Sequence, residues 1–156
     1  MANELVVQLT RVRAASDPLP LPRYMTTDAA GMDIYADLTE ALTIPPLGRA
    51  LIPTGFSLAL PQGYEAQVRP RSGLALRSGL TILNSPGTID ADYRDEVQIV
   101  VINLGDQPVH IKRGDRIAQL VVAPITRVRW QEVDHLEPTT RTGGFGHTEE
   151  MKKPGN

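Results

Sequence analysis

The stretch EVQIVVINL (96–104) is rich in valine and isoleucine. β-Branched residues favour strands, so this stretch predicts a strand. Working outward from it, similar apolar or alternating runs recur at short spacing, each closed by Gly, Pro, Asp or Asn: residues 4–10, 49–60, 64–70, 80–83, 108–112 and 116–125. Many short strands with turn signals between them are typical of an all-β sandwich or barrel.

Composition agrees with that interpretation. The chain has 156 residues, enough for one domain, with 13 glycines, 13 prolines and only 4% aromatic residues. It should therefore turn often and build its core from Val, Ile, Leu and Ala. A net charge of -2 gives no general attraction to nucleic acid, and the chain has no cysteine and no long apolar run. Its first residues, MANELVVQLTRVR, do not show the basic and then apolar pattern of a signal peptide. We expect a cytoplasmic protein with no nucleic-acid or membrane partner.

Two segments depart from the strand pattern. SGLALRSG (72–79) predicts one or two helical turns, with Ser72 as N-cap and Gly79 just past the end. Beyond Leu136 the periodicity stops, which predicts a body over 1–136 and a mobile arm over 137–156. The arm contains RTGGFGHTEE (141–150), which is like a phosphate loop but has no strand before it and no helix after it. Either it is a disordered end, or another part of the molecule supplies its other half.

Charged residues beside special backbone positions mark candidate sites. In AAGMDIYAD (29–37), Gly31 precedes Asp33. The simpler interpretation is a β-bulge glycine beside a turn-capping aspartate. In RPRSGLALRSG (69–79), three arginines surround Ser72 and Gly73 at a helix start; they are Arg69, Arg71 and Arg77. That arrangement suits an anion, and the alternative is a capped helix with solvated arginines.

The segment NSPGTIDADYRDE (84–96) joins two apolar runs through turn residues. A hairpin here would place Asn84 and Gly87 on the entering strand and a polar group near its mouth: Asp90, Asp92, Tyr93 and Arg94. Asp90 is a candidate general base for a water, while Asx-turns are the alternative role for both aspartates.

The segment KRGDRIAQL (112–120) contains a Gly-Asp turn, which the simpler interpretation makes an ordinary hairpin turn. Its unusual member is Gln119, a carboxamide among apolar neighbours that needs hydrogen-bond partners if it is buried.

In this order, the five stretches resemble the five motifs of the homotrimeric deoxyuridine triphosphatase (dUTPase) family, from Ala30 to Thr148. The resemblance implies a single-domain β jelly roll of the β-clip type. It also implies a homotrimer with three shared active sites, in which the arm closes over nucleotide held by a neighbouring subunit. The implied activity is magnesium-dependent hydrolysis of dUTP to dUMP and pyrophosphate, which keeps uracil out of DNA and supplies dUMP for thymidylate synthesis.

The resemblance also implies roles for individual residues. Asp90 would deprotonate the water that attacks the α-phosphorus, and Tyr93 would exclude a ribose 2′-hydroxyl. The uracil edge would be read by Asn84, Gly87, Thr88 and Ile89. The α- and β-phosphates would be bound by Arg71, Ser72 and Gly73.

Further roles fall on the remaining motifs. Gln119 would hold phosphate or the catalytic water, and Asp33 would orient hydrated Mg²⁺ through a water. From the arm, Phe145 would stack on uracil and Arg141 would reach the γ-phosphate, with further contacts from Gly146, His147 and Thr148.

The chain departs from the family pattern at two places. Asp95 stands where the family usually has glycine, and His147, Thr148 and Glu149 follow GGFG in place of serine, threonine and glycine. Two other functions stay open: a dCTP deaminase, for which no matching glutamate motif is seen, and a non-catalytic nucleotide-binding module. Asp90, Gln119 and Arg141 argue against the non-catalytic module, because a pure binder needs no water-activating base.

Overall fold

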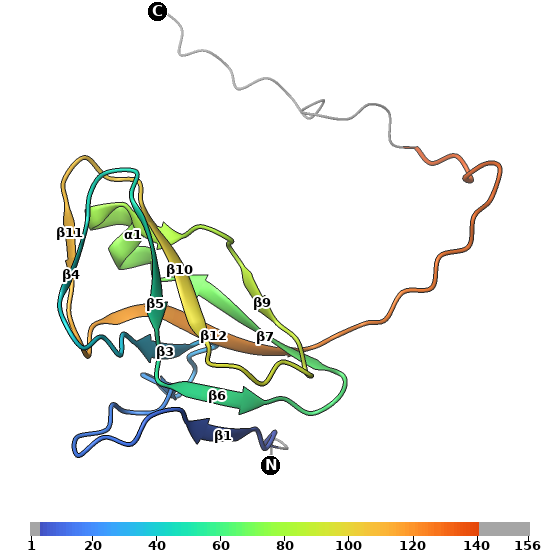
Figure 1. Ribbon diagram of the computed structural model, residues 1–156. Coiled ribbons are helices and arrows are strands. Elements are labelled where there is room, and N and C mark those ends of the chain that lie inside the picture. Colours follow the sequence, from blue (N-terminus) through green and yellow to red (C-terminus); the bar gives the residue numbers. More distant parts are fainter. Residues whose placement is uncertain (1–3, 141–156) are drawn as a thin grey trace, which may run out of the picture. The chain divides into compact units, whose positions relative to one another are not determined.

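The computed structural model describes residues 4–140, and nearly all its regular structure is β (Figure 1). One short helix, α1 (Ser72–Ser78), interrupts the strands. The strands are β1 (Gln8–Arg11), β2 (Arg23–Tyr24), β3 (Met32–Tyr35), β4 (Leu42–Ile44), β5 (Arg49–Pro53), β6 (Phe56–Ala59), β7 (Tyr64–Pro70), β8 (Leu80–Ile82), β9 (Gly87–Ile89), β10 (Gln98–Asn103), β11 (Val109–Ile111) and β12 (Arg116–Pro124).

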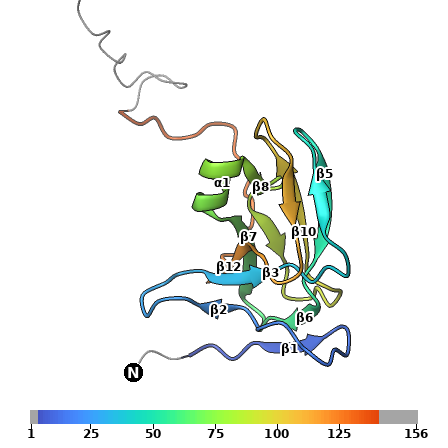
Figure 2. The ribbon, with the colours of Figure 1, turned by 90° about the vertical axis from the view of Figure 1, so that its left-hand side faces the viewer.

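The strands form four antiparallel sheets. The largest has the order β2-β3-β12-β7-β9, and a second has the order β5-β10-β8. Strand β1 pairs with β6, and β11 pairs with β4. Figure 2 shows β5 and β10 side by side, with α1 next to β8. This is the all-β fold that the strand pattern predicts, and it is the β jelly roll that the resemblance implies.

Strand β10 is the centre of the three-stranded sheet, and its alternation explains the core. Ile99, Val101 and Asn103 are each at most 1% exposed, since every second residue of a strand points to the same face. The Asn103 side chain donates to the carbonyls of Ile44 (3.0 Å) and Gln107 (2.8 Å) and accepts from the amide of Gly105, so this buried polar group is satisfied. Apart from Tyr35 and Phe56, the buried apolar residues of the described part are Ala, Ile, Leu and Val, as composition predicts.

The ends of α1 differ in part from expectation. The predicted N-cap Ser72 is wrong: Arg71 is the N-cap, in extended conformation and without a side-chain capping bond. Gly79 ends the helix as predicted, with a left-handed φ of 69°. A Cβ there would lie 2.2 Å from the backbone nitrogen of Gly105, so only glycine fits.

Two predicted hairpins have different partners. Strand β9 pairs with β7, whereas β10 pairs with β5 and β8. Asn84 therefore lies in the turn before β9 and not on a strand. The Gly-Asp turn at 114–115 connects β11 to β12, which belong to different sheets, so it does not close a hairpin.

The described residues divide into two units, 4–126 and 127–140. Within the described part of the second unit, residues 127–140, no helix or strand is formed. The boundary expected near residue 136 stays a prediction.

In residues 4–140 we find no helix with the length and apolar character needed to span a membrane.

Candidate active site

A row of polar side chains crosses four strands of the five-stranded sheet. Asp33 on β3 lies opposite Gln119 on β12, which in turn lies opposite Arg69 on β7. On the other side of Asp33, the row continues to Arg23 on β2. Directly opposed residues in antiparallel strands project from the same face, so one amide and two arginines share a face with one carboxylate.

Asp33 is the most buried member of this row, at 3% exposure. Its Oδ2 accepts from Nη1 of Arg116 at 3.0 Å, and its Oδ1 lies 3.4 Å from Nε of Arg71. The amide of Gln119 reaches Oδ1 at 3.4 Å. Asp33 is thus a strand residue between two arginines, and the interpretation as a turn cap is wrong. The bulge lies on β12, between Arg116 and Ala118, not at Gly31.

Arg71 is fixed by the backbone as well as by Asp33. Its Nη1 donates to the carbonyl of Arg116 at 2.9 Å, so it is not a freely solvated arginine. Its own carbonyl accepts from the amides of Leu74 and Ala75, the first bonds of α1. The N–H groups of Ser72 and Gly73 precede these bonds, beside the Arg71 side chain.

Sequence reasoning missed Arg116. Arg116 is the first residue of β12 and lies three residues before Gln119, within the segment 112–120. Arg71 and Arg116, the two arginines that contact Asp33, border a hollow of about 380 Å³. His110 and Asp115 also line it. The guanidinium groups of Arg71 and Arg116 border this hollow, and Arg69 lies opposite Gln119 on the same sheet, so positive charge gathers here.

Glycine 31 allows Gln119 to lie flat against β3. A Cβ on Gly31 would come within 3.3 Å of the Gln119 Cβ and 3.5 Å of its Oε1. Gln119 is half-buried, and its amide nitrogen points at Asp33. Its oxygen thus remains available as an acceptor for a ligand or a water.

The second group of predicted residues lies at the β9 edge of the sheet. Strand β9 ends the strand order, so one of its backbone edges has no neighbouring strand among the described residues. A Cβ on Gly87 would come within 3.3 Å of the Asn84 Nδ2, which places that amide against β9. Thr88 is exposed, and Ile89 is buried at 7% exposure. An amide beside free backbone donors and acceptors suits a flat polar base.

Asp90 follows β9 and is exposed, whereas the preceding Ile89 is buried. The amide of Tyr93 donates to the backbone carbonyl of Asp90 at 3.1 Å, so the backbone closes this turn. Within residues 4–140, neither Asp90 nor Asp92 has a side-chain hydrogen bond or ion pair, so the structure gives no support to Asx-turns here.

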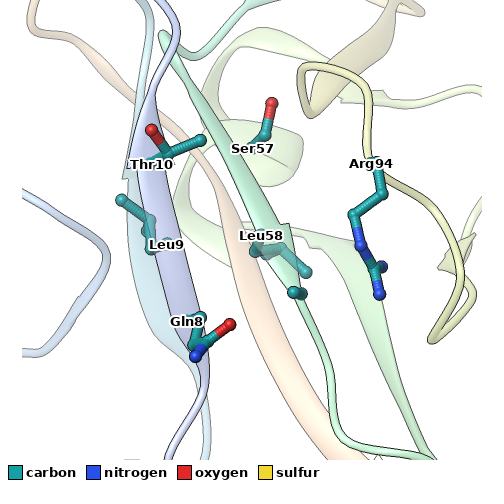
Figure 3. Close-up of a pocket in the computed structure, with 7 residues that line it drawn as sticks. Gln8, Leu9, Thr10, Ser57, Leu58 and Arg94 are labelled. Carbon is teal, nitrogen blue, oxygen red and sulfur yellow. The ribbon is translucent and has the colours of Figure 1, made fainter.

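Tyr93 and Arg94 complete this turn. The Tyr93 hydroxyl donates to the carbonyl of Glu96 at 2.9 Å, and the side chain is 38% exposed. Arg94 folds back, with Nη1 donating to the carbonyls of Ala91 and Tyr93. It also borders a groove of about 380 Å³. Figure 3 shows Arg94 on one side of this groove, with Leu9 on the other and Leu58 between them.

The two groups are far apart in one chain. Asp90 lies two strands from Gln119 across the sheet, and the position opposite it on β7 is four residues from Arg69. With strands about 4.8 Å apart and about 3.4 Å per residue, the backbones of Asp90 and Gln119 are roughly 17 Å apart, and those of Asp90 and Asp33 roughly 20 Å. Within one chain, the two groups of residues are therefore separate.

The remaining expectations concern the arm and the metal. Arg141, Phe145, Gly146, His147 and Thr148 lie outside the described residues. In residues 4–140 there is no group of three or more His, Cys, Asp or Glu side chains able to hold a metal ion. A carboxylate cage of that kind is thus not part of the described site.

Comparison with known proteins identifies the family. The dUTPase family matches residues 17–149. The chain is 60% identical over 134 residues to the deoxyuridine 5′-triphosphate nucleotidohydrolase of Desulfotalea psychrophila, covering 85% of this chain and 89% of that protein. It is 52% identical over 147 residues to the enzyme of the same name from Wolbachia sp. subsp. Brugia malayi, covering 92% and 94%.

Solved structures agree. The dUTPase of Staphylococcus bacteriophage 80alpha with dUpNHpp is similar with a TM-score of 0.77 at 25% identity, covering 90% of this chain and 96% of that one. A mutant dUTPase from phage phi11 of S. aureus has a TM-score of 0.73 at 24% identity, covering 85% and 99%, and shares the fold.

These comparisons place the chain among the hydrolases of nucleotide metabolism. The chain belongs to the dUTPase family and hydrolyses dUTP to dUMP. This sets aside the deaminase and the non-catalytic binding module.

Proposed function

We propose that the enzyme splits dUTP between its α- and β-phosphorus atoms, releasing pyrophosphate, in a site that two or more copies of the chain build together. Asp90 deprotonates the attacking water. The observation that carries the proposal is the strand register, which puts the backbones of Asp90 and Gln119 two strands and four residues apart, roughly 17 Å at ideal strand spacing. Reacting groups must lie about 3–3.5 Å apart, so Asp90 of one copy faces the phosphate site of another.

The arginine end binds the phosphates. Arg71 and Arg116 are held by Asp33, which keeps both guanidinium groups at one place before substrate arrives. The amides of Ser72 and Gly73 add neutral donors, and Gln119 holds a phosphate oxygen or the water. Fixed donors stabilise charge that develops on the phosphoryl oxygens without reorganising during reaction.

The β9 edge reads the base. Uracil presents an N–H between two carbonyls, which the unpaired backbone edge of Gly87, Thr88 and Ile89 and the Asn84 amide complement. Cytosine presents an amino group where uracil has a carbonyl, so a donor would meet a donor. Tyr93 packs under the sugar, where a ribose 2′-hydroxyl would meet its ring.

Asp90 suits the role of base because it is exposed and unpaired within the described residues. Its carboxylate needs no partner removed before it accepts a proton from water. If the proton is removed while the water oxygen approaches the phosphorus, no positive charge builds up on that oxygen.

Mg²⁺ fits this site as an ion bound to the triphosphate. Phosphate oxygens and waters supply the octahedral ligands that Mg²⁺ prefers, and no carboxylate cage is required. Asp33 would hold one of those waters, since the two contacts at its Oδ1 are long, at 3.4 Å, and leave acceptor capacity. The ion would neutralise charge on the triphosphate.

The arm closes the site from a further copy. Phe145 would stack on uracil, Arg141 would reach the γ-phosphate, and Gly146, His147 and Thr148 would line the phosphates. The shared sites correspond to a homotrimer, and body and arm divide near residue 136. Closure would expel water and complete the donor set.

Hydrolysis in ¹⁸O-labelled water tests the bond that breaks. Attack at the α-phosphorus places the label in dUMP, whereas attack at the β-phosphorus places it in pyrophosphate. Mass spectrometry of both products, with and without Mg²⁺, separates the two outcomes. Label found in pyrophosphate would overturn the proposed mechanism while leaving the activity intact.

A further inference from the structure

An ion pair anchors the far end of the Asp90–Tyr93 turn. Arg13 donates two hydrogen bonds to the Glu96 carboxylate, from Nη2 to Oε1 at 2.7 Å and from Nη1 to Oε2 at 3.1 Å. The amide of Gly55 donates to the same Oε1 at 2.8 Å. A two-pronged guanidinium–carboxylate contact fixes orientation as well as distance.

The anchor reaches Tyr93 through the backbone of Glu96. The carbonyl of Glu96 accepts the Tyr93 hydroxyl at 2.9 Å. The amide of the next residue, Val97, donates to the carbonyl of Phe56 at 2.9 Å, and Val97 is buried at 2% exposure. Tyr93 thus rests on a residue held on both sides, while its own side chain is 38% exposed.

Arg13 is itself fixed from three directions. Its Nη2 also contacts Oδ2 of Asp37 at 2.9 Å, and the amide of the preceding Val12 donates to the carbonyl of Gly55. Asp37 is further paired with Arg113 at 3.2 Å. Hydrogen bonds donated by Arg13 lower the pKa of Glu96, and the same bonds to Glu96 and Asp37 raise the pKa of Arg13, so the pair stays charged at neutral pH.

We propose that Arg13, acting through Glu96, is a positioning residue for Tyr93 and thereby sets how strongly the enzyme prefers deoxyribose to ribose. The inference rests on the proposed contact between Tyr93 and the sugar. The Tyr93 ring can exclude a ribose 2′-hydroxyl by steric contact only if the ring cannot move away from the sugar. The contact from Arg13 to Glu96 prevents that movement, because it holds the carbonyl on which the Tyr93 hydroxyl rests.

The test is the ratio of kcat/KM for dUTP to kcat/KM for UTP. Arg13→Met removes both prongs with similar side-chain length, and Arg13→Lys keeps the charge but loses the fork. We expect Arg13→Met to reduce the ratio roughly fivefold, about the effect of losing one intramolecular hydrogen bond, and Arg13→Lys to reduce it less. Both substrates are measured on one preparation, so partial unfolding cancels in the ratio.

Arg113→Met is the matched control. It removes an arginine from the same cluster, including a contact to Asp37, but does not touch Glu96. The preference should stay at the wild-type value in Arg113→Met. An equal loss in both variants would overturn the inference, because the effect would then belong to the cluster as a whole.

A double-mutant cycle tests the relay itself. Tyr93→Phe removes the hydroxyl that contacts Glu96 and keeps the ring. If the anchor acts through this hydroxyl, Arg13→Met adds little to Tyr93→Phe. If the effects of Arg13→Met and Tyr93→Phe on the ratio are fully additive, Arg13 does not act through the Tyr93 hydroxyl.

Tyr93→Ala distinguishes this inference from the proposed function. If Tyr93→Ala leaves the preference unchanged, the proposed role of Tyr93 is wrong, and the inference goes with it. If Tyr93→Ala narrows the preference but Arg13→Met does not, only the anchoring role of Arg13 is overturned.

Discussion

The Nη1 atom of Arg116 lies 3.0 Å from Oδ2 of Asp33, a residue 83 positions earlier in the chain. Arg71 approaches the other oxygen of the same carboxylate. Asp33 therefore acts as a counter-ion that allows two guanidinium groups to be close together in the absence of phosphate. In the proposed reaction, the arginines would need no large movement to meet a phosphate.

Asp33→Asn should weaken the fold and raise the affinity for a free anion. The arginines would lose their counter-charge, and because their side chains are 25% and 42% exposed we expect a loss of only about 1–2 kcal/mol in unfolding free energy. Pyrophosphate without Mg²⁺ should bind several-fold more tightly by calorimetry. Asp37→Asn, in the Arg13 cluster, should destabilise without changing pyrophosphate affinity; tighter binding there too would contradict the assignment.

Asp90→Asn should retain nucleotide binding and lower kcat by about two to four orders of magnitude, the usual contribution of a general base. Because Asp90 has no described partner, the melting temperature should not change. Asp92→Asn, in the same turn and equally exposed, is the control and should keep wild-type turnover. Turnover that survives in Asp90→Asn would remove Asp90 from the mechanism.

Subunit mixing tests the shared site. Asp90→Asn and Gln119→Ala should each be nearly inactive alone. After unfolding and refolding together in equal amounts, about a quarter of the sites should combine an intact Asp90 from one copy with an intact Gln119 from another. Recovered activity near that fraction is the expected result, and a mixture as inactive as its components would show that each chain carries a complete site.

Glu96 should make stability pH-dependent in acid. Its folded-state pKa is lowered by Arg13, so its stabilising contribution is present above the unfolded pKa of about 4.5 and is lost as pH falls below that value. The difference in melting temperature between wild type and Glu96→Gln should therefore be largest near neutral pH and shrink below about pH 4.5. A constant difference from pH 3.5 to 7 would contradict this origin.

Ending the chain before Arg141 should leave the β body folded and remove most activity. All described strands end at or before Pro124, so their pairing does not need the removed segment. Light scattering reports the association state, and a pyrophosphate assay reports activity. Loss of the assembled state would instead give the tail a structural role.

Much of the fold follows from local pattern, but the site depends on pairing. The alternation in 96–104 predicts β10, and the polar Gln119 among apolar neighbours points to a site on β12. The pairing of β9 with β7 is not a local property, so the sequence wrongly suggests a hairpin to β10. Arg116 reads as a surface arginine after a turn. The contact between Arg13 and Glu96 spans 83 positions, and no local spacing signals it.

Strand β12 contributes Ile117, Ala118 and Leu120 to the core, and Arg116 and Gln119 to the polar group around Asp33. Because side chains alternate along a strand, sliding β12 by one residue would put the carboxamide into the hydrophobic interior and turn leucine toward the proposed phosphate site. Such a slip would cost stability and catalysis together. Only a molecule with the native register of β12 can therefore bind its substrate.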